Sequence, residues 1–186
     1  MDRKGWPGTL AVAAVLIVLA IGLPMANRGI AAADVPLPAG SRVQVGPLSD
    51  DHSRPLSVQV PDGWALNTDA TALSESVALY NGSTSFQLSV ILAQGATPEQ
   101  LWHGLGEIEQ AGGVVPRLGA TMPIKTAQGV PGLAGPITVQ DHTAAVAVFA
   151  APSLGADVVV TGPPEEVMGS DISGMLSSIR FDGAGA

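Results

Sequence analysis

The sequence contains no cysteine, and this absence excludes several kinds of site at once. Disulfides, thiolate nucleophiles, Cys-ligated zinc and a lipid-modified cysteine all require a thiol. A domain that leaves the cytoplasm must therefore be held together by its hydrophobic core alone. The chain of 186 residues is long enough for this, because a domain of about 150 residues buries roughly two-thirds of its surface.

Common catalytic and phosphate-binding motifs are also missing. No serine stands in a Gly-x-Ser-x-Gly pattern, and no glycine-rich loop carries the lysine of a phosphate-binding loop. The glycine-rich stretch 129–135 contains Pro131 and precedes an expected strand, so we interpret it as a hairpin turn. The sequence therefore predicts no catalytic residue, no metal site and no cofactor, and we expect the protein not to be an enzyme.

Positive charge is scarce in most of the chain. From Asp34 to the C-terminus, 15 Asp and Glu stand against five Lys and Arg, a net charge of −10. Without a basic surface to neutralise phosphates, we expect no nucleic-acid partner. The simplest interpretation of the acidic surface is that it keeps the domain in solution.

What the sequence does contain is an apolar run at residues 9–26, with no charge between Lys4 and Arg28. At about 1.5 Å per residue, such a run forms one helix across a hydrocarbon core about 30 Å thick. Arg3 and Lys4 place the N-terminus inside and the remaining chain outside the cytoplasmic membrane. We expect a single-pass membrane protein with its domain displayed outside.

A second interpretation of the same run is a secretory signal. It has a basic start, an apolar core, Pro24 after the core, and small residues up to Ala33 that fit a cleavage site. The protein would then be secreted after cleavage near Ala33. Both interpretations place the domain outside the cytoplasm.

Composition divides the chain into four regions. These are an N-terminal membrane anchor or signal segment (1–26), an Ala/Pro/Gly-rich linker (27–41), an extracytoplasmic domain (42–182) and a tail (183–186). Regular hydrophobic patterning begins only at Arg42, so we expect the folded domain to begin there.

Two elements within the domain carry clear local signals. Asn81–Thr84 joins the runs 77–80 and 85–93 as a hairpin, with Phe86, Leu88, Val90 and Leu92 on one face of the second strand. Thr97 and Gln100 form a capping box, with Pro98 at the first position of the helix that follows.

Later elements are weaker but regular. A hairpin is expected around 129–132, and strands at 144–150 and 157–161. A closing helix then opens at Pro163–Glu166, and Arg180-Phe181 adds a short last strand. The apolar positions of this helix are Met168, Ile172, Met175, Leu176 and Ile179. Four strands, a helix, four strands and a helix, joined by short hairpins, predict an α+β fold with an antiparallel sheet.

The pattern resembles the Mog1/PsbP-like α/β/α sandwich and, more narrowly, the actinobacterial cell-envelope proteins of the LpqN/LpqT group. The resemblance rests on LSVQVPDGW (56–64), on 78–93, on the helix from Thr97, on 129–139 and on the closing helix that leads into 177–181. It implies an antiparallel sheet with two main helices behind the N-terminal hydrophobic helix. The group has no shared catalytic residues, and this chain lacks its lipid-bearing cysteine.

Three aromatic residues form the candidate ligand-binding site. Trp64, Tyr80 and Trp102 lie at the ends of expected elements, where chain reversals can bring them to one edge of the sandwich. Tryptophan and tyrosine offer both an apolar body and a hydrogen-bond donor, which suits a ligand cleft. Our hypothesis is that Trp64 and Trp102 approach each other at a cleft between helix and sheet. The alternative is two separate core positions.

The histidines carry weaker hypotheses. Asp50, Asp51 and His52 have the chemistry of a metal or base site, but adjacent side chains rarely point at one centre, so a solvated turn is expected. His142 follows an Asp in an expected turn, and His103 is expected on the surface of the first helix.

Together these features favour a non-catalytic envelope protein that binds a protein, lipid or cell-wall component. One alternative is an accessory subunit of a membrane complex, contacted through the N-terminal helix. That helix has no polar residue inside it, so it lacks side chains that could form specific hydrogen bonds to a partner helix. Another alternative is a hydrolase that uses His52 or His142.

Overall fold

The computed structural model describes residues 34–50, 52–111, 116–139 and 142–182, with the side chains of the last turns of the first helix, 106–111, left aside. The predicted anchor or signal segment 1–26, the cleavage region near Ala33 and the tail 183–186 lie outside the described residues. In the part that is described, no helix has both the length and the apolar character that a membrane crossing requires.

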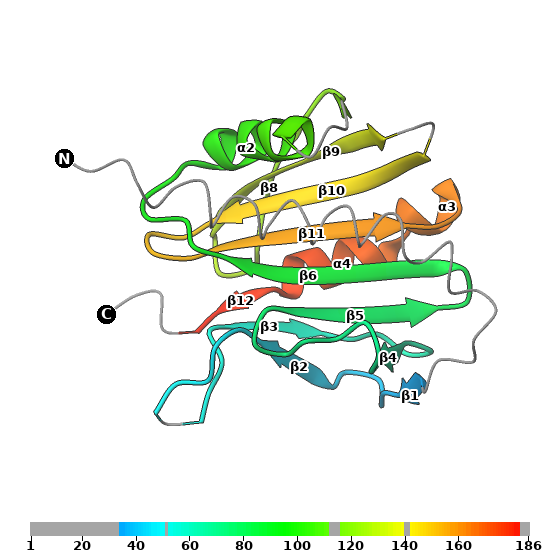
Figure 1. The fold of residues 1–186 in the computed structure, drawn as a ribbon. Helices are drawn as coiled ribbons and strands as arrows, with labels where there is room; N and C mark the ends of the chain where they lie inside the picture. The colour runs from blue at the N-terminus through cyan, green and yellow to red at the C-terminus, as the bar shows by residue number, and fades with distance from the viewer. Residues whose placement is uncertain (1–33, 51, 112–115, 140–141, 183–186) are drawn as a thin grey trace.

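Most strands form one large antiparallel sheet (Figure 1). Its order is β1-β4-β5-β6-β11-β10-β9-β7, and β8 also pairs with β9. The strands are β1 (Asp34–Pro36), β4 (Ala65–Asn67), β5 (Ser76–Asn81), β6 (Thr84–Ile91), β7 (Arg117–Leu118), β8 (Met122–Lys125), β9 (Pro131–Val139), β10 (His142–Ala150) and β11 (Gly155–Thr161).

A second, small antiparallel sheet has the order β12-β3-β2. It contains β2 (Arg42–Val45), β3 (Leu56–Gln59) and β12 (Arg180–Phe181). The helices are α2 (Pro98–Ala111), α3 (Pro164–Val167) and α4 (Ser170–Ser178). The expected α+β class with an antiparallel sheet is confirmed, and so is the last strand at Arg180-Phe181.

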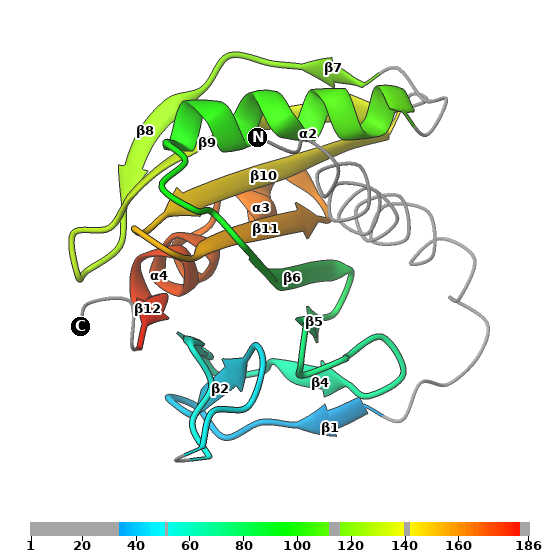
Figure 2. The ribbon, with the colours of Figure 1, turned by 60° about the vertical axis from the view of Figure 1, so that its left-hand side comes forward.

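The helices lie on opposite faces of the large sheet (Figure 2). Helix α2 packs on β9 and β10, whereas α4 packs on the other face together with β3 of the small sheet. We call these two sides the α2 face and the α4 face. Each strand of the sheet is buried on both sides where both layers cover it, which explains the near-continuous apolar runs of β10 and β11.

Strand alternation divides the core into two clusters. In β10, Ala147 and Phe149 belong to the cluster on the α4 face, whereas Val146 and Val148 belong to the cluster on the α2 face. Successive side chains of a strand point to opposite sides, so neighbours in sequence enter different clusters. The α4-face cluster is the larger one and also includes Leu56 and Val58 of the small sheet.

The capping box of α2 is confirmed. The backbone N–H of Gln100 donates to Thr97 Oγ1 at 3.3 Å, and the N–H of Thr97 donates to Gln100 Oε1 at 2.9 Å. The helix begins at Pro98, whose missing N–H would have had no partner there. These bonds satisfy two groups that every helix start leaves unpaired.

The two predicted hairpins are confirmed, with one correction. Strands β5 and β6 pair up to Asn81 and Thr84 at the turn, and β8 pairs with β9. Phe86, Leu88 and Val90 share the α4 face, as expected. Leu92 does not join them: it follows the end of β6 and is 65% exposed.

The expected boundary between linker and domain differs from the structure. Asp34–Pro36, part of the expected linker 27–41, is strand β1 and pairs with β4 at the edge of the large sheet. The folded region therefore begins before Arg42. A three-residue edge strand with every residue exposed has no hydrophobic alternation, so the sequence pattern could not reveal it.

The closing helix is interrupted. It consists of the short α3 and of α4, with Met168 and Gly169 between them. Met168, expected on the buried face, is 84% exposed because it lies in this break, whereas Ile172, Met175 and Ile179 are buried as predicted. A Cβ atom at Gly169 would lie 2.9 Å from the carbonyl oxygen of Glu166, so only glycine fits the break without adjustment.

Candidate functional site

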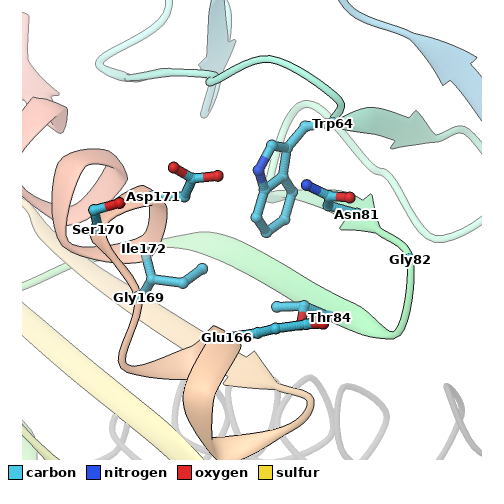
Figure 3. A pocket seen from close by; sticks show the side chains of 9 residues that line it. All are labelled: Trp64, Asn81, Gly82, Thr84, Glu166, Gly169, Ser170, Asp171 and Ile172. Carbon is cyan, nitrogen blue, oxygen red and sulfur yellow. The ribbon is translucent and has the colours of Figure 1, made fainter.

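A cavity of about 350 Å³ opens on the α4 face, at the end of the sheet where the β5–β6 hairpin turns (Figure 3). Three parts of the chain meet there: the residue before β4, the hairpin turn, and the break between α3 and α4. The lining residues are Trp64, Asn81, Gly82, Thr84, Glu166, Gly169, Ser170, Asp171 and Ile172. Its volume lies at the small end of the range of about 300–1,000 Å³ that is usual for ligand sites.

Trp64 forms the inner wall of the cavity. The residue is 2% exposed and packs edge-on against Phe86, with ring centroids 6.4 Å apart and planes at 85°. Its indole nitrogen Nε1 is buried and has no hydrogen-bond partner. Figure 3 shows this nitrogen on the side of the ring that faces Asp171. A buried donor without an acceptor lowers stability by about 1–3 kcal/mol, so a ligand atom that accepts this hydrogen bond would recover that free energy.

The N-terminus of α4 supplies further donors. Its N-cap is Gly169, and no side chain caps the helix. The first backbone N–H groups of a helix have no partner within it and carry a partial positive charge. Ser170, Asp171 and Ile172 bring this first turn into the cavity wall. The wall therefore offers backbone donors beside the indole N–H.

Two carboxylates face the same space. Glu166 of α3 accepts a hydrogen bond from the hydroxyl of Thr84, which fixes α3 against the start of β6. Asp171 is exposed, so its side chain is free to turn. The nine lining residues include no Lys or Arg. The lining therefore holds both donors and acceptors but no positively charged side chain.

Glycine positions the hairpin against α3. Gly162, with φ of +151°, links β11 to α3, and a Cβ atom there would lie 2.5 Å from Thr84 Oγ1. The close approach brings Glu166 within reach of the Thr84 hydroxyl. The geometry of the carboxylate side of the cavity therefore depends on a glycine that lines no part of it.

The structure separates the aromatic residues of the predicted site. Trp64 lies at the cavity, but Trp102 is buried in the α2-face cluster, where its ring packs against Gly135. The large sheet lies between the two rings, so they do not approach each other and our cleft hypothesis was wrong. Trp102 sits on the inner side of α2, and α2 packs on the face that Trp64 does not occupy.

Tyr80 lies apart from both tryptophans. It precedes Asn81 in β5 and follows Leu79 of the α4-face cluster, so alternation turns its ring to the α2 face. Its side chain is half-buried and hydrogen-bonded to Asn67. Burial raises the pKa of Tyr80, and the bond to Asn67 opposes that shift.

The histidines lie outside the cavity. His52 is exposed in a turn with φ of +63°, and its Nδ1 lies 3.2 Å from the carbonyl oxygen of Asp50. The expected solvated turn is therefore present. His142, at the start of β10, and His103, on α2, are also exposed. Over the described ranges, no three His, Asp or Glu side chains gather closely enough to hold a metal ion.

Sequence reasoning missed one buried charge. Asp157 of β11 is 5% exposed, and its Oδ1 has no hydrogen-bond partner. Burial raises the pKa of Asp157 to about 7. It lies between Ser89 of β6 and Val148 of β10, on the α2 face. The available sequence signal was its place in the apolar run of β11, directly before Val158. A strand that is covered on both faces buries the residues of both faces, so an Asp within it is buried as well.

The comparisons with known proteins concern the fold. No family model matches the chain, and the search of curated proteins found no match. Among solved structures, it is similar to the cyanobacterial PsbP (CyanoP) of Synechocystis sp. PCC 6803, with a TM-score of 0.49 and 11% identity over 78% of this chain and 95% of that one.

A protein from Bacteroides thetaiotaomicron is also similar, with a TM-score of 0.42 and 11% identity over 77% of this chain. The chain spans about half of that protein, 49% of its length. Both similarities concern the arrangement of strands and helices alone. Neither matched structure supports the narrower LpqN/LpqT grouping, and neither brings a ligand or partner to this chain.

Proposed function

We propose that this protein is a non-catalytic binding protein of the cell envelope, displayed outside the cytoplasmic membrane by its N-terminal apolar segment. The binding site is the cavity between the β5–β6 hairpin and the start of α4. One observation carries the proposal: the indole N–H of Trp64, a residue of the cavity lining, is buried and lacks an acceptor. A ligand that supplies the acceptor removes the cost of that unpaired donor.

The placement outside the membrane rests on the sequence. The apolar run 9–26 follows Arg3 and Lys4, which favours a cytoplasmic N-terminus and an external domain. Membership of the LpqN/LpqT group of envelope proteins is likewise part of the proposal, on the strength of the stretches 56–64 and 78–93. The ligands that such a protein meets are envelope components.

The absence of cysteine allows a direct test of display. A single cysteine is introduced by Ser83→Cys, at the exposed hairpin turn, or by Lys4→Cys, before the apolar run. Intact cells are treated with a membrane-impermeant maleimide. We expect labelling at position 83 without lysis and at position 4 only after lysis. Labelling of both positions only after lysis would contradict display outside the membrane.

Binding at the cavity is tested by photo-crosslinking in the native host. A benzophenone amino acid replaces Asn81 at the cavity or, as a matched control, Met122, which is 63% exposed on β8. After irradiation, the intact mass of the purified protein is measured. We expect a discrete adduct at position 81 and none at position 122. Equal adducts, or none at either position, would contradict a binding site in this cavity.

A further inference from the structure

The hydrogen-bonding groups of the cavity define the class of ligand that it takes, provided that the proposed binding function holds. On the donor side are the indole N–H of Trp64, the side-chain amide of Asn81, and the backbone N–H groups at the uncapped start of α4. Each requires an acceptor atom on the ligand. A ligand with lone pairs on several oxygens meets this requirement.

The acceptor groups of the cavity also restrict the class of ligand. Glu166 and Asp171 line the cavity, and ionised carboxylates accept hydrogen bonds but donate none. A ligand that displaced water from them without offering donors would leave two charges poorly solvated. The ligand must therefore carry O–H or N–H groups as well as acceptors, within a cavity of about 350 Å³.

These two requirements exclude the simpler classes. A phosphate or carboxylate ligand would meet the N–H groups but would be repelled by Glu166 and Asp171, with no Lys or Arg in the lining to compensate. A metal cation would suit the two carboxylates but offers no lone pair to Trp64. An apolar ligand would satisfy neither set.

We infer that the cavity binds one unit of a neutral saccharide. Each hydroxyl group of a sugar both donates and accepts, so adjacent hydroxyls can pair with both the donors and the carboxylates of the lining. Asp171 is exposed and turns to admit a hydroxyl to the indole nitrogen that it faces in Figure 3. The carboxylates orient the sugar, and the N–H of Trp64 gains its acceptor.

The test uses the full-length protein in detergent micelles, labelled with [¹⁵N]tryptophan. Its three tryptophans give three indole N–H signals, assigned by Trp→Phe variants. The probes are chitotetraose, cellotetraose and maltotetraose, with inorganic phosphate and Ca²⁺ as charged probes. We expect at least one tetrasaccharide to move the Trp64 proton signal downfield, while the Trp102 signal stays in place and reports an intact fold.

A charge-neutral variant sharpens the result. Asp171→Asn should weaken binding of that saccharide about tenfold, the usual loss for a hydrogen bond to a charged group. Asp69→Asn, at an exposed loop residue away from the cavity, should leave the affinity unchanged. The affinity is measured from the Trp64 shift, and the Trp102 signal again confirms folding.

The contradicting outcomes separate the two proposals. If only phosphate or only Ca²⁺ moves the Trp64 signal, the saccharide inference fails while binding at the cavity stands. If none of the probes moves it, the saccharide inference also fails. In that case the crosslink at position 81 decides the wider proposal, which fails only if the adduct is missing as well.

Discussion

The two faces of the large sheet are covered by different elements. The α4 face is closed by a second sheet and by α4, which together enclose the larger core cluster. The α2 face is covered by one helix over β9 and β10, with a smaller cluster beneath it. The closed face retains a cavity at its hairpin end, whereas the other face buries a carboxylate, Asp157, within the sheet.

Among the described residues, each face contains one buried side-chain polar atom without a partner, and the two atoms differ in what can satisfy them. Trp64 is a lining residue of the cavity, and its buried Nε1 is on the side of the ring that faces Asp171, in the first turn of α4. Asp157 Oδ1 lies on a strand between two neighbouring strands of the same sheet. The first can be satisfied by a ligand, and the second by a proton. This is why we place binding on the α4 face and pH sensitivity on the α2 face.

The largest expected effects come from removing the tryptophan of each face. Trp64→Ala and Trp102→Ala should each lower the free energy of unfolding by about 3–5 kcal/mol, because both rings are buried in a core cluster. Denaturant midpoints measure the loss. The double variant should show an additive loss, since the sheet separates the rings and they share no contact. A loss below about 1 kcal/mol at either position would contradict its place in the core.

The next effect concerns Asp157 and depends on pH. Burial raises its pKa from the ordinary value of 3.8 to about 7. The folded state therefore holds a proton that the unfolded state has lost, and stability falls as pH rises from about 4 to about 7. The loss is complete about one pH unit above the folded-state pKa, where both states are ionised. At about 1.4 kcal/mol per pKa unit, the loss amounts to a few kcal/mol.

Asp157→Asn removes this dependence. We expect the variant to be more stable than the wild type at pH 8, with a smaller difference at pH 4.5, in urea unfolding monitored across that range. Asp69→Asn, at an exposed loop residue, should leave the pH profile unchanged. A variant that is destabilised equally at both pH values would show that Asp157 is not a buried, uncompensated charge.

The features that were predicted correctly are those that depend on interactions between residues close in sequence. The capping box of Thr97 and Gln100 and the turn from Asn81 to Thr84 each involve groups a few residues apart, so the chain itself specifies them. The position of β11 beside β6 and the separate β12-β3-β2 sheet depend on contacts between distant segments. No pattern within one segment encodes such pairing, which explains why β1 was missed.

Of the residues that line the cavity, Trp64 was the one named as a site residue from the sequence. Trp64 was identified because it is a rare aromatic residue after a turn, but its partner was taken to be Trp102 rather than the start of α4. Glu166 and Asp171 were hidden in a closing helix that periodicity showed as continuous. Gly169 marked the break, yet a single glycine within a helical pattern is often tolerated.

A smaller loss of stability is expected from removing the N-cap of α2, the helix that covers the α2 face. Thr97→Ala removes the side-chain acceptor for the N–H of Gln100 at the start of α2. The loss should be about 0.5–2 kcal/mol, the usual range for an N-cap. Thermal unfolding measures it, and Thr97→Ser serves as the control that retains the hydroxyl. If alanine and serine behave alike, the capping bond contributes nothing to stability.

The smallest effect is a stabilisation on the α4 face. Gly174 lies within α4, and a Cβ atom there would meet no atom within 4 Å. Gly174→Ala should therefore stabilise the protein by about 0.5–1 kcal/mol, because alanine favours the helix. Gly169→Ala, in the break before α4, should instead destabilise it, since its Cβ would crowd the carbonyl of Glu166. Denaturant midpoints should move in opposite directions, and a shift in the same direction would contradict the helix break.

The most direct test of the central claim compares saccharide affinity after two conservative changes, one on each face. Trp64→Phe keeps an aromatic ring but removes the N–H beside the cavity, and Trp102→Phe makes the same change on the α2 face. With the tetrasaccharide that binds the wild type, isothermal titration calorimetry should show an affinity about tenfold weaker for Trp64→Phe and unchanged for Trp102→Phe. Equal affinities in both variants would contradict the claim that the indole N–H of Trp64 is a binding group.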